Sequence, residues 1–211
     1  SLTLYMYQNP KRAKKLYSEV VPKAVDEYLS LIEKFPEQKE KDQLSNPVWH
    51  VHNGEPPKEK IVMSFSMLLN LAGSSNTDDK KTLWKFINRF HKNAKPESNP
   101  ILDSLTEHAI KFFKDKLKPN KVYKKPSEQE KKALTNLASN IEKISDNMPP
   151  EEIQTIVYTV GKENGYEKNL RDWFKLIYQV MFGDIDGPRM GFFVSFFGVK
   201  ETVKLIKDKI N

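Results

Sequence analysis

Apolar residues recur every three or four positions in one short segment after another, and this spacing sets the fold that the chain can adopt. Positions with that spacing share one face of an α-helix, so each segment predicts an amphipathic helix with one buried side. Two stretches, residues 2–7 and 48–51, also permit a short strand each. We therefore expect an all-α protein, a multi-helix bundle in which only these two stretches are candidates for extended structure.

Capping residues and prolines indicate where the helices begin. Asn9-Pro10 offers a cap followed by a proline in the first turn, and Asn169 is placed to cap a later helix. Ser127-Glu128-Gln129-Glu130 has the pattern of a capping box, in which the first and last side chains accept from each other's backbone N–H. Pro22 should kink or divide the first helix, and the prolines within residues 35–60 predict a loop.

Positive charge is concentrated in one part of the chain. The protein carries a net charge of +7, and residues 61–132, here called the basic segment, hold 15 lysines and arginines against 8 acidic residues. The rest of the chain is nearly balanced. Such a local excess is typical of a surface that binds a polyanion. A solvated, lysine-rich surface explains the charge count equally well.

The sequence offers no catalytic or metal centre. It lacks a glycine-rich phosphate loop and a serine nucleophile motif, and it has no cysteine. Its four histidines are scattered, and His50 and His52 have no third ligand near them in the sequence. We therefore predict no catalytic residue, no metal and no cofactor in these 211 residues.

Nothing in the sequence predicts a membrane or secretory segment. No run of eighteen apolar residues occurs, and residues 1–7 lack the basic start and the cleavage pattern of a signal peptide. The absence of cysteine fits a cytosolic protein. Because the chain does not begin with Met, we interpret it as a fragment of a cytoplasmic protein.

Basic residues recur at helical spacing opposite an apolar stripe, and a lysine-rich loop, residues 118–126, follows them. Lysines beside an exposed tyrosine suit phosphates and a stacked base, although a flexible, solvated connector is an equal alternative. The candidates for contact with a phosphate backbone are Lys81, Lys85, Arg89, Lys111, Lys114, Lys118, Lys121, Tyr123 and Lys124. Large aromatic residues on the apolar stripes are predicted to be core: Trp84, Phe112, Phe113 and Trp173.

The most specific stretch is Gly183-Asp184-Ile185-Asp186-Gly187-Pro188-Arg189-Met190-Gly191. Its glycines and proline predict a tight turn that aims backbone donors and Arg189 at one point beside a helix N-terminus, where an anion or base edges bind. Arg171 and Lys175, one turn apart on the preceding helix, are expected to flank the same place. A simple helix–helix turn with a surface arginine is the alternative.

Several stretches resemble a known family when taken together. They are residues 1–31, 46–52, 62–71, 79–89, 153–158, 170–174 and 187–191. Through them, nearly the whole chain resembles the C-terminal region of class I lysyl-tRNA synthetases. The last sixty residues also resemble, more loosely, the end of bacterial glutamyl-tRNA synthetases.

The resemblance implies a division of labour along the chain. Residues 1–60 would be linker and stem-contact helices that follow the catalytic core, residues 61–146 a basic helical subdomain, and residues 147–211 the anticodon-binding subdomain of a helical cage. In the glutamyl relative the loop around the corresponding proline touches anticodon bases, which implies that role for Pro188, Arg189 and Met190. Gly187 stands where that relative usually has a polar side chain.

The same resemblance implies the activity of the parent enzyme, which joins lysine to its tRNA with ATP and magnesium through a lysyl-adenylate. The HIGH-like and KMSKS-like signatures of that chemistry do not occur here. The expected partners are therefore lysine tRNA and the enzyme's own catalytic domain, and the chain alone is expected to be inactive. The alternative function is a basic helical scaffold or protein–protein interaction module. The sequence leaves the oligomeric state open.

Overall fold

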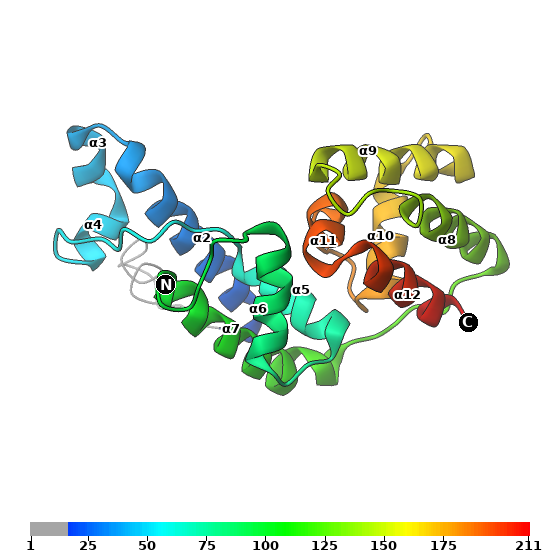
Figure 1. The fold of residues 1–211 in the computed structure, drawn as a ribbon, viewed down its shortest axis with the longest axis horizontal. Coiled ribbons are helices and arrows are strands. Elements are labelled where there is room, and N and C mark those ends of the chain that lie inside the picture. The colour runs from blue at the N-terminus through cyan, green and yellow to red at the C-terminus, as the bar shows by residue number, and fades with distance from the viewer. Residues whose placement is uncertain (1–16) are drawn as a thin grey trace. The chain divides into compact units, whose positions relative to one another are not determined.

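A computed structural model describes residues 17–211, and every regular element within them is a helix (Figure 1). The prediction of an all-α protein is confirmed. The prediction of a possible strand at residues 48–51 was wrong, because these residues lie in helix α4 (Pro47–Val51). This helix begins at the cap Asn46 and the proline Pro47. The other possible strand, residues 2–7, and the predicted helix start at Asn9-Pro10 lie outside the described residues.

Internal contacts divide the chain into two compact units. The first takes in the described residues up to Leu68 together with Ala94–Ala109, and the second consists of Leu69–Asn93 and Ile110–Asn211. The division into segments 1–60, 61–146 and 147–211 concerns function rather than compactness, and it stays a prediction.

The first unit begins with a short 3-10 turn and a long amphipathic helix. The turn η1 (Ser18–Val20) leads into α2 (Val21–Lys34), so Pro22 lies in the first turn of α2 and marks its start. Val25, Leu29 and Ile32 form the buried stripe of α2. The predicted loop at residues 35–60 is partly helical, with these elements: η2 (Phe35–Glu37), α3 (Glu40–Ser45) and α4.

Asn46 fixes α4 against the end of α2. Its side-chain oxygen accepts from the Val48 N–H at 3.0 Å and so caps α4. Its amide nitrogen donates to the Leu31 carbonyl at 3.3 Å and to the Gln38 side chain at 2.8 Å. With 3% of its surface exposed, Asn46 is a buried polar residue whose hydrogen bonds are all made within the protein.

Two carboxylates cap helices that lie far from them in sequence. Asp26 on α2 accepts from the Phe65 N–H at 2.6 Å, at the start of α5 (Phe65–Ser75). Glu59 accepts from the Ile101 and Leu102 N–H groups at 2.6 and 3.0 Å, at the start of α7 (Pro100–Phe112). A negative charge at the N-terminus of a helix accepts hydrogen bonds from the free N–H groups and interacts favourably with the positive end of the helix dipole.

The second unit contains the remaining helices, together with parts of α5 and α7. They are α6 (Lys80–Phe90), the π-helix η3 (Phe113–Leu117), the 3-10 turn η4 (Lys118–Asn120), α8 (Glu128–Ile141), α9 (Pro150–Gly161), the π-helix η5 (Lys162–Tyr166), α10 (Leu170–Met181), α11 (Met190–Phe197) and α12 (Val199–Ile210). Helices α8 to α12 gather around one another (Figure 1), and α11 packs along α9 and also against α6 and α12.

In this unit the predicted capping box and most of the predicted core are confirmed, whereas the predicted cap at Asn169 does not form. Ser127 and Glu130 form both hydrogen bonds of the capping box. Trp84, Phe113 and Trp173 are buried, and Phe112 is half-buried. The buried residues of α6 are Leu83, Trp84, Phe86 and Ile87, whereas Phe90 is 39% exposed.

Two glycines allow close helix contacts in the core. A Cβ on Gly191 would overlap the Pro150 carbonyl, so only glycine lets α11 approach the start of α9 at this point. The Gly191 N–H also donates to the Gln154 side chain at 2.9 Å. A Cβ on Gly161 would overlap the ring of Trp173, whose indole N–H donates to the Val157 carbonyl at 2.9 Å. These contacts fix α11, and with it the loop that precedes it.

Candidate nucleic-acid interface

The loop of residues 183–189, here called the Pro188 loop, joins α10 to α11 and is held by a tyrosine. The Tyr178 hydroxyl donates to the Pro188 carbonyl at 3.0 Å. Gly187 passes so close to the Tyr178 ring that a Cβ there would overlap it. Burial raises the pKa of Tyr178 to about 12, and the nearby Tyr158 and Asp186 add to the shift, so the hydroxyl stays a donor at neutral pH.

Arg189 is exposed at the start of α11. Its guanidinium carbon lies 5.6 Å from the centroid of the Phe192 ring, a cation–π contact along the first turn of the helix. Its carbonyl accepts from the Phe193 N–H at 3.0 Å. The backbone of Arg189 is thus fixed while its side chain is open to solvent.

The next two residues are committed to the core. Met190 is completely buried, so its side chain cannot reach a ligand in this conformation. The Gly191 N–H is taken by Gln154. The expected convergence of backbone donors at this turn is therefore reduced, and the side chain of Arg189 is the group that the loop exposes. The predicted roles of Pro188, Arg189 and Met190 in anticodon binding stay predictions.

Arg171 and Lys175 are exposed on α10, on the same helical face as Tyr178. Because Tyr178 binds the Pro188 carbonyl, this face leads to the Pro188 loop. The flanking arrangement inferred from the sequence is thus compatible with the structure, although Asn169 does not cap α10 as expected. Its side-chain amide donates instead to Asp172 at 2.6 Å.

The lysine-rich loop lies against the end of α10, a neighbour that sequence reasoning missed. The Lys124 N–H donates to the Gln179 carbonyl at 3.1 Å, and the Val122 N–H to the Gly183 carbonyl at 3.4 Å. Lys121 forms an ion pair with Asp184 at 3.2 Å. Two candidate regions sixty residues apart in sequence therefore meet at the start of the Pro188 loop.

Tyr123 is less available for stacking with a base than a fully exposed loop tyrosine would be. The Lys209 ammonium lies 3.5 Å from its ring centroid, so one face of the ring is covered. Partial burial raises the pKa of its hydroxyl. The same loop also contains Lys124, which pairs with Glu130 at 2.6 Å.

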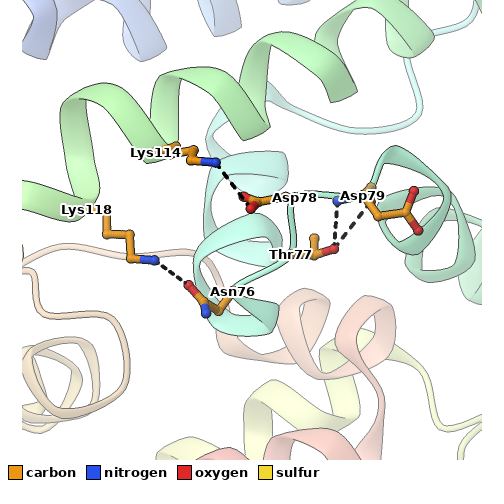
Figure 2. A network of polar contacts seen from close by, with 6 residues as sticks. All are labelled: Asn76, Thr77, Asp78, Asp79, Lys114 and Lys118. Atoms are coloured by element: carbon orange, nitrogen blue, oxygen red, sulfur yellow. Dashed lines mark hydrogen bonds and ion pairs between the residues drawn. The ribbon is translucent and has the colours of Figure 1, made fainter.

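Two further lysines bind the turn between α5 and α6. Lys114 forms an ion pair with Asp78 at 3.2 Å, and Lys118 donates to the side-chain oxygen of Asn76 at 2.9 Å. Figure 2 shows both contacts. The Lys114 and Asp78 side chains are 60% and 73% exposed, so their ion pair is weak and screened by salt. A phosphate can therefore compete for Lys114, but it must replace an existing partner.

Arg89 has a structural role, because it connects three helices. Its guanidinium donates to the Phe197 carbonyl, the last of α11, and pairs with Glu201 on α12 at 2.5 Å. The Arg89 hydrogen bond holds the pKa of Glu201 below its usual range. Arg89 thus ties α6 to the joint between α11 and α12.

Among the described residues, three of the lysines predicted to contact a phosphate backbone have no ion-pair or hydrogen-bond partner for their ammonium groups: Lys81 and Lys85 on α6, and Lys111 on α7. All three are exposed. They are the lysines best placed to bind phosphates without breaking a contact within the protein.

The two histidines that were weighed as metal ligands have other partners. The His52 ring nitrogen lies 2.9 Å from the Tyr28 hydroxyl, and that of His50 lies 2.9 Å from the Leu44 carbonyl. Within residues 17–211, no group of three or more histidine or acidic side chains is placed to hold a metal ion. In the same range, no helix is both long and apolar enough to cross a membrane.

Comparison with known proteins confirms the resemblance to lysyl-tRNA synthetases. Residues 1–55 match the family model of the class I tRNA synthetases for lysine. The lysine–tRNA ligases of Rickettsia felis and Rickettsia bellii are each 42% identical to the chain over 212 aligned positions, which cover 100% of the chain. That of Roseobacter denitrificans is 43% identical over 206 positions. The chain spans about 40% of the length of these relatives.

Proposed function

We propose that this chain, which is homologous along its full length to part of the class I lysine–tRNA ligases, is their tRNA-binding and anticodon-recognising region. The full-length similarity to enzymes of that name is the main support. The whole enzyme would attach lysine to its tRNA in the cytoplasm, with ATP and magnesium, through a lysyl-adenylate. Its catalytic domain would be the second partner of this region.

The Pro188 loop supports the anticodon-reading role. Its backbone is fixed by Tyr178 and by the close contact of α11 with α9, whereas the Arg189 side chain is exposed to solvent. A fixed loop loses little conformational entropy when it binds, and an arginine fork can pair with a base edge through two hydrogen bonds. Unpaired anticodon bases expose such edges.

The basic segment supports a second, less selective role. Lys81, Lys85 and Lys111 offer exposed charge with no partner among the described residues, which suits binding to phosphates of any sequence. The proposed region therefore combines general affinity for tRNA with selection of one anticodon.

Binding and activity measured on the purified chain test this proposal. We expect fluorescence anisotropy to show saturable binding of lysine tRNA that weakens when the anticodon is exchanged. We expect no lysine-dependent exchange between ATP and pyrophosphate. Equal binding of both tRNAs would contradict anticodon recognition but leave general tRNA binding, and absence of binding would favour a scaffold. Exchange activity would contradict the assignment of catalysis to another domain.

A further inference from the structure

One face of α10 alternates basic and aromatic side chains. Arg171, Phe174, Lys175 and Tyr178 follow one another at intervals of three or four residues, so they share that face. The two basic residues are exposed and the two aromatic residues are half-buried. An amphipathic helix that only covered a core would bury its aromatic rings and keep charge on the opposite face.

A tyrosine of the neighbouring helix extends this face. Tyr158 on α9 is 41% exposed, and its ring meets Phe174 edge to face, with centroids 5.0 Å apart and planes at 71°. Phe174 in turn lies 6.1 Å from the Tyr178 ring. Among the described residues, the Tyr158 hydroxyl has no hydrogen-bond partner. The three rings form a row whose outer end, at Tyr158, is open.

The inner end of the row lies at the Pro188 loop. Tyr178 donates to the Pro188 carbonyl, and its ring packs against Gly187, which lies between Asp186 and Pro188. Arg189 follows at the start of α11. The row therefore runs from an exposed aromatic ring to the residue that we propose reads a base.

We propose that Tyr158 and Phe174 form a stacking platform for an unpaired RNA nucleotide, with Arg171 and Lys175 binding the adjoining phosphates. The inference rests on the proposed function and identifies how an anticodon loop would be held open beside Arg189. Stacking on aromatic rings is the general way in which proteins hold splayed bases, and nearby cations follow the backbone. Two acidic residues lie near this face. Asp172 accepts a hydrogen bond from Asn169, and Asp186 lies beside Tyr178.

The test uses a hairpin RNA with the anticodon stem and loop of lysine tRNA, in which loop positions carry 2-aminopurine one at a time. The variants are Tyr158→Ala, Tyr158→Phe and Tyr158→Leu, with Tyr17→Ala as the matched control. Tyr17 is an exposed tyrosine, 59% exposed, in the first unit. Circular dichroism and thermal melting show whether each variant folds, and Tyr158→Leu keeps apolar bulk if the alanine variant does not.

We expect Tyr158→Ala and Tyr158→Leu to raise the Kd about ten-fold, as the loss of one stacked base does, with the salt dependence of binding unchanged. The quenching of one 2-aminopurine should vanish in both and persist in Tyr158→Phe and Tyr17→Ala. A folded Tyr158→Leu variant with wild-type Kd and quenching would overturn the platform while leaving the proposed function intact. Failure of the wild-type chain to bind the hairpin would refute both.

Discussion

The basic segment and the Pro188 loop differ in how their charges are used. Within the basic segment, Arg89, Lys114, Lys118, Lys121 and Lys124 each contact another part of the protein. The Pro188 loop contains two acidic residues and one arginine, yet its arginine is exposed and its backbone is fixed. The charge count of a segment therefore overstates what it can offer to a ligand, because many of its charges already have partners, whereas the exposed Arg189 stands on an anchored loop.

The largest expected effect would break this anchoring. In Gly191→Ala the new methyl group would overlap the Pro150 carbonyl, so α11 must move away from α9. Overpacking of this kind costs about 1–3 kcal/mol or more. We expect a clear fall in melting temperature and loss of anticodon selectivity, with general tRNA affinity retained. Ser195→Ala on the same helix is the control, and wild-type selectivity in a destabilised Gly191→Ala would show that the anchoring is not required.

Arg189→Ala tests selection at the loop directly. A bidentate contact between arginine and a base contributes about 1–3 kcal/mol of discrimination. The variant should lose that much affinity for cognate tRNA and scarcely any for a tRNA with an exchanged anticodon. Arg189→Lys should restore charge without selectivity. Equal losses on both tRNAs would make Arg189 a phosphate contact, the role proposed for the lysines of the basic segment.

Tyr178→Phe removes one tether and leaves the rest of the loop intact. Loss of the hydrogen bond to the Pro188 carbonyl should cost about 0.5–1.5 kcal/mol of stability. Folding raises the pKa of Tyr178 from its ordinary value of 10 to about 12. Its contribution is therefore complete below about pH 10 and is lost as the pH rises towards about 12. Chemical denaturation of wild type and Tyr178→Phe should differ at pH 8 and converge above pH 11, and a constant difference would refute the linkage.

The smallest effect concerns single lysines of the basic segment. If Lys111 binds a phosphate, Lys111→Ala should weaken binding to all tRNAs alike and lower the salt slope by about 0.7–0.9. Lys114→Ala and Lys118→Ala should change the slope less, because each lysine must first leave Asp78 or Asn76. Affinity measured across a salt series distinguishes the two groups. A selective loss for one anticodon would contradict a phosphate-binding role for any of them.

The sequence predicted that the protein is helical and placed most of the large aromatic residues of the core. Helical periodicity placed Trp84, Phe113 and Trp173 correctly in the core, and the capping box at Ser127 formed as expected. Such features depend on residues within a few positions of one another, which a sequence contains directly. On α6, Phe86 is buried and Phe90 is exposed, although the two residues are four positions apart on one helix face. Periodicity does not distinguish them, because their burial depends on which helices cover each end of α6.

The tertiary structure alone decided which polar groups remain free. Polar side chains that no local pattern marks, those of Asp26, Glu59 and Asn46, bind backbone groups of other elements. Met190 belongs to the motif that carries the resemblance, yet its side chain is core. Lysines at identical helical spacing separate into paired and unpaired groups according to the chain that passes beside them. Spacing fixes the face on which a side chain lies, but its partners come from segments far away in sequence, and only the packing of the helices brings those together.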